Sequence, residues 1–244
     1  MSIKSLIADA SHIVTFTGAG ISTESGISDY RSQGGLWQRY QPVTIQEFLV
    51  NEESRREYWR RKKELYAQVR NATPNEGHKG IARLETLGKL LGVITQNIDG
   101  LHQLAGNTRV LELHGTAREV TCLSCAKTIP SEIVYQRMTE GEEIPLCFDC
   151  GGLLKPNTIS FGQALNPDVL QESIEWARKC DLMLAIGSTL IVEPAASIPR
   201  IAKQNGAKLA IVNRDPTPLD SIADVVIHES IGEVFEKLEA QEMN

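Results

Sequence analysis

Short apolar runs alternate along the chain with longer segments in which apolar residues recur every three or four positions. The short runs predict strands at His12–Thr17, Lys89–Thr95, Arg109–Leu113, Thr158–Phe161, Leu182–Ile186, Lys208–Val212 and Asp224–Ile227. The longer segments predict helices at Ser2–Ala10, Gly77–Leu87, Pro167–Lys179, Pro194–Gln204 and Ile231–Leu238. Strands that alternate with helices are typical of a parallel sheet covered on both faces. We therefore predict an α/β fold built on a doubly wound parallel sheet.

Two stretches interrupt this alternation. Residues 28–75 contain no clear strand and carry most of the aromatic residues, whereas residues 117–156 carry two Cys-x-x-Cys pairs and little apolar mass. We interpret both stretches as insertions that form a second, smaller domain. The larger domain, which holds the parallel sheet, is then predicted to consist of residues 1–27, 76–116 and 157–244.

Small or polar residues directly follow four of the predicted strands. They are Gly18-Ala19-Gly20, Gln96-Asn97-Ile98-Asp99, Gly187-Ser188-Thr189 and Asn213-Arg214-Asp215. In a doubly wound sheet such segments lie at one edge, and ligands bind in the crevice outside the carboxyl ends of the strands. Gly18 and Gly20 would let the backbone turn tightly and approach a pyrophosphate, with N–H donors from the following helix N-terminus. Thr23 stands where the third glycine of a GxGxxG fingerprint belongs, so a plain tight turn is an equal alternative for this motif alone.

Four of the five cysteines form two close pairs, Cys122 with Cys125 and Cys147 with Cys150, with 21 residues between the pairs. Each pair places two thiolates on one tight turn, and two such turns complete a tetrahedral zinc site. Four protein ligands leave no position for water, so the zinc is expected to be structural rather than catalytic. A redox pair or two disulfides are the alternatives. We expect Cys180 to be a small buried apolar residue.

Composition narrows the class of protein further. The 244 residues are 41% apolar and carry a formal net charge of −6, so the chain can bury a sizeable core and offers no basic field for direct nucleic-acid binding. The N-terminal residues lack the basic segment and long apolar core of a signal peptide. No apolar run approaches the roughly 18 residues of a transmembrane helix. We expect a cytoplasmic protein without membrane contact.

In order and spacing, these motifs resemble the sirtuins. The resemblance rests on Gly18-Ala19-Gly20-Ile21-Ser22, Gly26-Ile27-Ser28-Asp29-Tyr30-Arg31, Gln96-Asn97-Ile98-Asp99, Leu113-His114-Gly115, the four paired cysteines, Lys155-Pro156-Asn157, Phe161-Gly162, Gly187-Ser188-Thr189 and Val212-Asn213. It covers the chain from about residue 5 to 238. It implies an NAD-dependent protein-lysine deacylase, in the first instance a deacetylase. It also implies a Rossmann-type domain, a smaller domain with a helical part and a zinc module, and an acyl-lysine peptide bound between the two.

The resemblance assigns residues to three tasks. His114 resembles the catalytic base, and Asn97 and Asp99 resemble residues that orient ribose, water and carboxamide. The positions around NAD are Gly18, Ala19, Gly20, Thr23, Asp29, Tyr30, Arg31, Gln96, Asn97, Ile98, Asp99, Gly187, Ser188, Thr189, Asn213 and Ile231, with Ser188 and Asn213 on the adenosine side. The candidate substrate residues are Ile159, Phe161 and Gly162, together with Tyr58 and Arg61.

The implied reaction forms no covalent bond to the enzyme. The acyl oxygen of the substrate lysine attacks the ribose carbon that bears nicotinamide, and nicotinamide leaves. His114 helps to deprotonate a ribose hydroxyl that attacks the resulting alkylimidate, which yields lysine and O-acyl-ADP-ribose. His114 suits this task because it follows a strand at the proposed ligand edge and imidazole titrates near neutral pH; the other four histidines are expected to be structural. For Asn97 and Asp99, capping of the following helix is the alternative.

Several positions depart from the family pattern. Ser28 and Tyr30 stand where the family usually has Pro and Phe. Gln163 replaces a frequent acidic residue, and Ser160 replaces a frequent large apolar one. These departures concern peptide and acyl preference rather than the reaction.

Tyr58 and Arg61 form a Tyr-x-x-Arg motif, and their side chains would share one face of a helix. In some sirtuins such a pair holds the carboxylate of succinyl- or malonyl-lysine, and arginine is suited to bidentate carboxylate binding. The stretch is rich in Arg and Lys, so an exposed run of charges is the simpler explanation. We therefore expect neutral acyl groups, acetyl through butyryl, with desuccinylase or demalonylase activity as the alternative.

Other functions share part of this pattern. Protein ADP-ribosylation and simple NAD hydrolysis would use the same residues up to the loss of nicotinamide. A non-catalytic NAD- or zinc-dependent binding module is disfavoured because His114 and Asn97 are both present. A dehydrogenase is disfavoured by the missing third glycine and by the zinc module within the fold.

Overall fold

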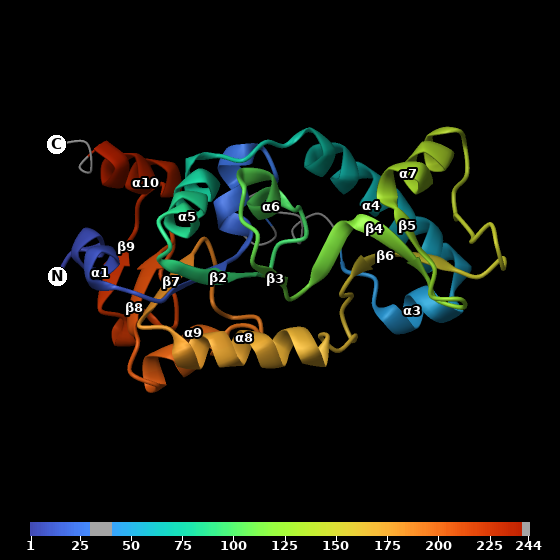
Figure 1. The fold of residues 1–244 in the computed structure, drawn as a ribbon. Coiled ribbons are helices and arrows are strands. Elements are labelled where there is room, and N and C mark those ends of the chain that lie inside the picture. Colours follow the sequence, from blue (N-terminus) through green and yellow to red (C-terminus); the bar gives the residue numbers. More distant parts are fainter. Residues whose placement is uncertain (30–40, 241–244) are drawn as a thin grey trace.

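The computed structural model describes residues 1–29 and 41–240. Among these residues, a six-stranded parallel sheet forms the centre of the larger part, in the order β3-β2-β1-β7-β8-β9. Its strands are β1 (Ile13–Thr17), β2 (Leu90–Thr95), β3 (Val110–Glu112), β7 (Leu182–Ile186), β8 (Lys208–Val212) and β9 (Val225–Ile227). The strands β1 and β7 lie at the centre, with β2 and then β3 on one side and β8 and then β9 on the other (Figure 1). This is the strand order of a Rossmann fold, so the predicted fold class is confirmed.

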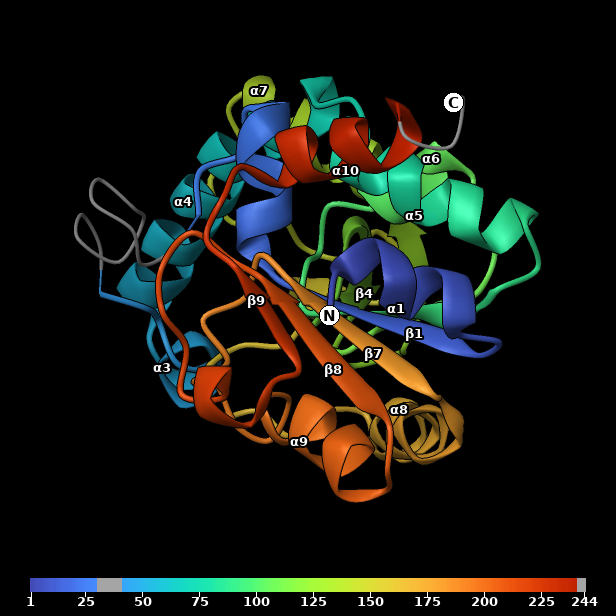
Figure 2. The ribbon, with the colours of Figure 1, turned by 90° about the vertical axis from the view of Figure 1, so that its left-hand side faces the viewer.

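Helices cover both faces of this sheet. Figure 2 shows α1 (Ile3–Asp9), α5 (Glu76–Thr86) and α10 (Ile231–Ala240) on one face, and α8 (Pro167–Lys179) and α9 (Ser197–Gln204) on the other. Within residues 1–29 and 41–240, three short helical segments lie in the connections: η1 (Ala19–Ser25), α6 (Leu101–Ala105) and η2 (Asp220–Ile222). None of the described helices combines the length and the apolar character needed to cross a membrane.

The two central strands, β1 and β7, are buried at every position because helices cover the sheet on both faces. In β7, Leu182, Leu184 and Ile186 join the core beneath α1, α5 and α10. Met183 and Ala185 join the core beneath α8 and α9. All five side chains are buried. A strand covered on both faces gains from apolar residues on both, so its sequence shows a continuous run rather than an alternation.

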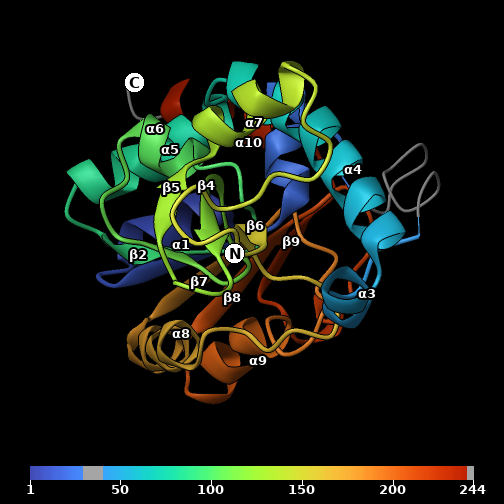
Figure 3. The same ribbon diagram turned by 90° about the vertical axis from the view of Figure 1, so that its right-hand side faces the viewer.

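The smaller part combines helices with a three-stranded antiparallel sheet, ordered β5-β4-β6 (Figure 3). Its elements are α3 (Ile45–Val50), α4 (Glu52–Asn71), β4 (Gly115–Cys122), β5 (Thr128–Pro130), α7 (Ser131–Thr139) and β6 (Leu154–Thr158). The helices α3 and α4 come from the first predicted insertion, and the strands and α7 lie in or next to the second.

One apolar core holds the smaller part together. Phe48 and Trp59 from the first insertion pack with Val120 of β4 and with Val134 and Tyr135 of α7. The first four of these side chains are completely buried. The expectation that residues 117–156 contribute little apolar mass is therefore wrong. The segment has an apolar face, and the aromatic residues of the first insertion cover it.

Two predicted elements differ from the structure. The strand predicted at Thr158–Phe161 is wrong, because β6 ends at Thr158 and runs antiparallel to β4 in the smaller sheet. Ile159 and Phe161 made the run apolar, but these side chains line a groove rather than a core. The helix predicted from Pro194 begins at Ser197.

Candidate active site

The turn after β1 presses against the turn after β7. Gly20 donates its N–H to the carbonyl of Gly187 at 2.8 Å, and Ile21 donates to the carbonyl of Gly18 at 3.1 Å. A Cβ on Gly18 or Gly20 would lie 2.9 Å or 2.8 Å, respectively, from the Gly187 oxygen. The glycines are therefore required for the close approach of two strand ends. The idea that the N–H groups of this turn point at a pyrophosphate needs correction for Gly20 and Ile21, whose donors are used within the protein.

Asn97 lies where the ends of β1 and β2 meet. Its backbone N–H donates to the Thr95 hydroxyl at 3.0 Å. Its side-chain amide donates to the Gly18 carbonyl at 3.1 Å and to the Ser22 hydroxyl at 3.0 Å. Because both amide protons bond within the protein, Oδ1 is the atom that Asn97 can offer as an acceptor to a ligand.

Asp99 joins two helical segments through one buried carboxylate. Oδ2 accepts the Ser22 hydroxyl proton at 2.7 Å, and Oδ1 accepts the Leu101 N–H at 2.9 Å at the start of α6. Burial raises the pKa of Asp99 above its ordinary value, although the bonds from Leu101 and Ser22 oppose this rise. The capping role considered from the sequence is therefore present, in a side chain that also faces the site.

Strand β4 holds the second half of the same loop. The Ala117 N–H donates to the Ile98 carbonyl at 2.8 Å. The Arg118 guanidinium donates to the Asp99 carbonyl at 3.0 and 3.2 Å. Residues 96–99 are thus bonded on one side to the large sheet and on the other to the strand that leads into the smaller part.

His114 follows β3 and bonds to the loop through its imidazole. Its Nδ1 lies 2.9 Å from the Gln96 carbonyl oxygen. A carbonyl can only accept, so Nδ1 carries the proton, and in the neutral ring Nε2 is the basic nitrogen. The His114 carbonyl in turn accepts the Ile159 N–H at 2.8 Å. The first bond orients the imidazole toward the loop, and the second holds the backbone of His114 against the segment that follows β6.

The ends of β7 and β8 bring further polar groups to this edge. The Gln96 amide donates to the Ser188 hydroxyl at 2.8 Å. Asn213 donates its side-chain N–H to the Asp215 carbonyl at 2.7 Å, and its own carbonyl accepts from His228 Nδ1 at 2.7 Å. The Asn213 side chain therefore closes the turn after β8, which is ordinary turn chemistry for an asparagine.

Loop 96–99 separates two hollows. The small pocket has Ala19, Ser22, Ile27, Ser28, Leu65, Val69 and residues 96–99 around it. The large groove has a volume of about 680 Å³ and includes His114 in its wall. Gln96, Ile98 and Leu65 line both hollows. A reaction across this wall would bring a group from the small pocket to a group in the groove.

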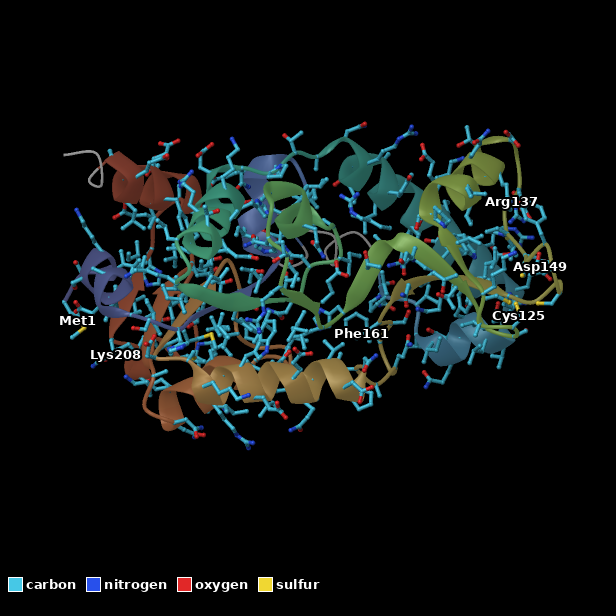
Figure 4. All side chains as sticks on the ribbon, in the orientation of Figure 1. Met1, Cys125, Arg137, Asp149, Phe161 and Lys208 are labelled. Atoms are coloured by element: carbon cyan, nitrogen blue, oxygen red, sulfur yellow. The ribbon has the colours of Figure 1, made fainter. Side chains whose placement is uncertain are left out.

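The large groove runs between the two parts of the molecule. Tyr58 and Arg61 line it from α4, and Ile159, Phe161 and Gly162 line it from the segment after β6. Figure 4 shows Phe161 between the two parts, and 47% of this residue is exposed. The groove is therefore an open, largely apolar channel bounded by both parts.

Arg61 lines the groove but is already paired. Its Nε donates to the Glu57 carboxylate at 2.6 Å, and its Nη1 bonds to the Gln41 carbonyl. Arg60 and then Arg61 lower the pKa of Glu57 to about 2, although burial opposes them. A carboxylate in the groove would have to compete with Glu57 for the guanidinium.

Lysines surround Tyr58 at the same wall. Lys62 Nζ lies 5.4 Å from the centre of the Tyr58 ring and donates to the Thr158 hydroxyl at 3.2 Å. Burial would raise the pKa of Tyr58, but the ammonium groups of Lys62 and Lys155 outweigh it, so this pKa lies below its ordinary value. Of these two lysines, Lys62 lines the groove, and Lys155 is buried behind Tyr58.

The four paired cysteines form one cluster at the outer end of the smaller part, where Figure 4 marks Cys125. We call Cys122, Cys125, Cys147 and Cys150 the cysteine cluster. Their sulfurs all lie within 4.8 Å of one another; those of Cys122 and Cys150 are 3.5 Å apart, and those of Cys125 and Cys147 are 3.8 Å apart. Zinc–sulfur bonds of about 2.3 Å in a tetrahedron place sulfurs about 3.8 Å apart. The geometry fits structural zinc and is too wide for disulfides.

The structure brings most of the predicted site residues to this region. Those that line a hollow or join the bonds at the strand ends are Gly18, Ala19, Gly20, Gln96, Asn97, Ile98, Asp99, His114, Gly187, Ser188, Asn213, Tyr58, Arg61, Ile159, Phe161 and Gly162. Thr23 donates its hydroxyl to the Gly20 carbonyl at 2.9 Å, and Thr189 follows Ser188. Ile231 is buried in the core at the start of α10, and Asp29 is half-buried beside Ser28. Tyr30 and Arg31 lie outside the described residues.

Sequence reasoning left Ser22, Leu65 and Val69 out of the site. Ser22 bonds to both Asn97 and Asp99, and its place directly after the glycine turn was a signal that could have found it. Leu65 and Val69 come from α4 in the first insertion. No local pattern indicates that this helix reaches the loop at the sheet edge.

The fold and the site define a class of protein: a Rossmann-type sheet with a four-cysteine module inserted beside the ligand edge. The Sir2 family model matches residues 18–194. The chain is 49% identical over 233 residues to the NAD-dependent protein deacetylase of Thermodesulfovibrio yellowstonii, covering 96% of this chain and 91% of the relative. It is 43% identical over 242 residues to NAD-dependent protein deacylase 2 of Pyrobaculum aerophilum, covering 98% and 94%. The chain belongs to the Sir2 family.

Solved structures agree with this assignment. A structure described as Sir2 with a p53 peptide and NAD+ has a TM-score of 0.91 at 38% identity, with 100% of both chains covered. A structure of a Sir2 enzyme bound to a propionylated peptide has a TM-score of 0.90 at 38% identity, covering 100% of this chain and 99% of the other.

Proposed function

We propose that this protein is an NAD-dependent protein-lysine deacylase that releases nicotinamide and O-acyl-ADP-ribose. The observation that carries the proposal is the placement of His114: its imidazole is oriented by the Gln96 carbonyl in the groove, next to the wall that separates the groove from the small pocket. The proposal is supported by the relatives, which are named NAD-dependent protein deacetylase or deacylase.

The residues at the sheet edge fit NAD as the co-substrate. Ala19, Asn97 and Asp99 would hold its nicotinamide end in the small pocket, and Ser188 and Asn213 would hold its adenosine end. When bound, NAD supplies the ribose carbon that accepts the acyl oxygen and the nicotinamide that leaves. The cysteine cluster would hold zinc, which ties the smaller part together far from this chemistry.

Each polar residue of the site then has a defined task. Asn97 and Asp99 orient the reacting groups, because their side chains are fixed by Ser22 and are nearly excluded from water. His114 Nε2 accepts the proton of a ribose hydroxyl, while Nδ1 stays bonded to the Gln96 carbonyl. The acyl-lysine lies in the groove between Ile159, Phe161 and Gly162 on one side and α4 on the other.

Substitution of the base tests the proposal. His114→Ala should lower deacylation about 10²–10⁴-fold without loss of the fold. Nicotinamide exchange should partly survive, because that step precedes the need for the base. His12→Ala, at an exposed position remote from the site, is the matched control. Near-wild-type turnover of His114→Ala on an acetyl-lysine peptide would contradict the proposed role.

A co-substrate test separates this function from its rivals. Deacylation requires that NAD loss depend on the acyl-lysine peptide and that the products include O-acyl-ADP-ribose. Release of nicotinamide at the same rate without an acyl-peptide would instead indicate ADP-ribosylation or NAD hydrolysis.

For the acyl group, we propose a preference for neutral chains, acetyl through butyryl. The groove is mostly apolar, and the guanidinium of Arg61 is paired with Glu57. A succinyl carboxylate would have to displace an internal partner. The solved relative bound to a propionylated peptide supports a neutral chain of this size.

A second candidate is the removal of acidic acyl groups, and the lysines beside Tyr58 favour it. Lys62 lines the groove beside Tyr58, and its ammonium group would attract a carboxylate bound there. Arg61→Met and Lys62→Met separate the two candidates. If either cation binds succinate, its loss should cost roughly 1.5–3 kcal/mol, about a tenfold to hundredfold fall in kcat/KM for succinyl-lysine. If neutral chains are preferred, wild-type enzyme should favour acetyl-lysine, and Arg61→Met should barely change that activity.

A further inference from the structure

A row of buried polar groups runs from α6 to the backbone of Asn97. His102 Nε2 lies 2.9 Å from the Thr17 hydroxyl, at the end of β1. The Thr17 hydroxyl donates to the Thr95 hydroxyl at 2.8 Å, at the end of β2. Thr95 in turn accepts the Asn97 N–H at 3.0 Å. His102, Thr17 and Thr95 are each at most 3% exposed, so this row is shielded from water.

The row has one consistent direction. A hydroxyl has a single proton, and Thr17 gives its proton to Thr95. The hydrogen between His102 and Thr17 must therefore come from His102 Nε2. Burial lowers the pKa of His102 to about 3 and the neighbouring His78 adds to this effect, although the Asn107 side chain opposes both. The ring is neutral at physiological pH and acts as a fixed donor rather than as a base.

The row ends at the residue whose amide lines the small pocket. Asn97 is held by its N–H from one side and by its side-chain bonds to Gly18 and Ser22 from the other. Without the donor of His102, the Thr17 hydroxyl can turn its proton away from Thr95. The acceptor of the Asn97 N–H then loses one of the groups that orient it.

We propose that His102 is a positioning residue for Asn97: through the hydroxyls of Thr17 and Thr95, it fixes the backbone at Asn97 and thereby the amide that faces the small pocket. The catalytic consequence of this inference rests on the proposed role of Asn97. The structural consequence, that the Asn97 N–H is held by this row, does not.

The test compares His102→Leu and Thr17→Val with His102→Gln, which keeps a side-chain N–H donor. Two readouts are needed: hydrogen exchange of the Asn97 backbone amide, and kcat and KM for deacylation. The Leu and Val variants should each speed exchange at Asn97 about tenfold and lower kcat about tenfold, with KM for the acyl-peptide little changed. His102→Gln should restore most of both losses. The double variant should lose no more than either single variant, because both break the same row.

His78→Leu is the matched control. His78 is completely buried, and its ring lies 5.0 Å from that of His102, but it bonds to Asn75 rather than to the row. This variant should lose stability while exchange at Asn97 and kcat stay near the wild-type values below its unfolding temperature. Equal effects of His78→Leu and His102→Leu on both readouts would overturn the inference.

The remaining outcomes are also decisive. If His102→Leu does not fold, Thr17→Val and Thr95→Val decide, since they change shape very little. Unchanged exchange at Asn97 in these variants overturns the inference regardless of turnover. If Asn97→Ala retains full turnover, the proposed role of Asn97 fails, and the exchange data still test the row by themselves.

Discussion

Glu112 on β3 has an unusual electrostatic environment close to the site. It lies two residues before His114. Burial raises the pKa of its carboxyl to about 7, and the charges of Asp99 and Glu119 add to the rise. A hydrogen bond from Gln103 and the charge of Arg118 oppose it only in part. The carboxyl is therefore protonated in the folded protein over a pH range in which it is ionised in the unfolded chain.

The consequence for stability has a definite sign. The folded state binds the extra proton between pH 4.5, the ordinary value, and about pH 7. Stability therefore falls as the pH rises through this window, and the cost of ionising Glu112 is fully present above it. With these two pKa values the cost is about 3 kcal/mol at pH 8.5 and about 1 kcal/mol at pH 5. Glu112→Gln removes this cost.

The variant should therefore be more stable than the wild type by an amount that grows by about 2–3 kcal/mol from pH 5 to pH 8.5. For a chain of this length, that is a gain in relative Tm of about 5–10 °C. Thermal unfolding of both proteins at the two pH values measures it. Glu172→Gln, on the exposed side of α8, controls for the loss of one negative charge. A Tm difference between Glu112→Gln and the wild type that is the same at both pH values would refute the reasoning.

Three further predictions follow from the contacts described above. Chelation of zinc should unfold the smaller part, because the cysteine cluster joins the end of β4 to the turn at residues 147–150; well under one equivalent of metal in folded, active protein would contradict this. Gly20→Ala should lower the free energy of unfolding by about 1–3 kcal/mol, because its Cβ would lie 2.8 Å from backbone atoms of Gly187. The control Gly26→Ala meets no atom within 4 Å and should cost about 1 kcal/mol because of its positive φ. Denaturant titrations measure both values. Arg118→Met removes both donors to the Asp99 carbonyl and should lower kcat severalfold. Arg118→Lys should restore part of this loss. Equal kcat for Arg118→Met and the wild type would count against the role of β4.

The larger part could be predicted because its information is local. A strand buried on both faces is a continuous apolar run, and the run ends where the polar residues of the edge begin, as at Thr17 and Thr95. The same rule failed at Thr158–Phe161, where Ile159 and Phe161 are apolar because they line a groove. A local pattern records that a side chain avoids water, but it does not record whether a core or a ligand replaces the water.

The existence of a smaller part with a cysteine module was predicted, but its core was not, because that core is shared between distant segments. In sequence, β2 and β3 of the large sheet lie between Phe48 and Trp59 on one side and Val120 and Tyr135 on the other, yet the four side chains pack together. The apolar face of the second segment is covered by aromatic residues of the first, so neither segment alone indicates the core that they form together. The cysteine spacing was readable because four thiolates must meet at one ion, which is a constraint that short sequence motifs carry.

The groove shows why a motif can identify a reaction and still leave its substrate open. His114 has its task because of one bond, from Nδ1 to a backbone carbonyl, and the strand that precedes it sets that bond. The Tyr-x-x-Arg motif depends instead on what else the arginine meets. Arg61 faces the groove as the motif requires, but Glu57, one turn earlier on the same helix, occupies its guanidinium. Lys62, which belongs to no motif, contributes positive charge to the same wall. Acyl preference is therefore set by the balance of these neighbouring charges, and the pair of variants Arg61→Met and Lys62→Met measures that balance directly.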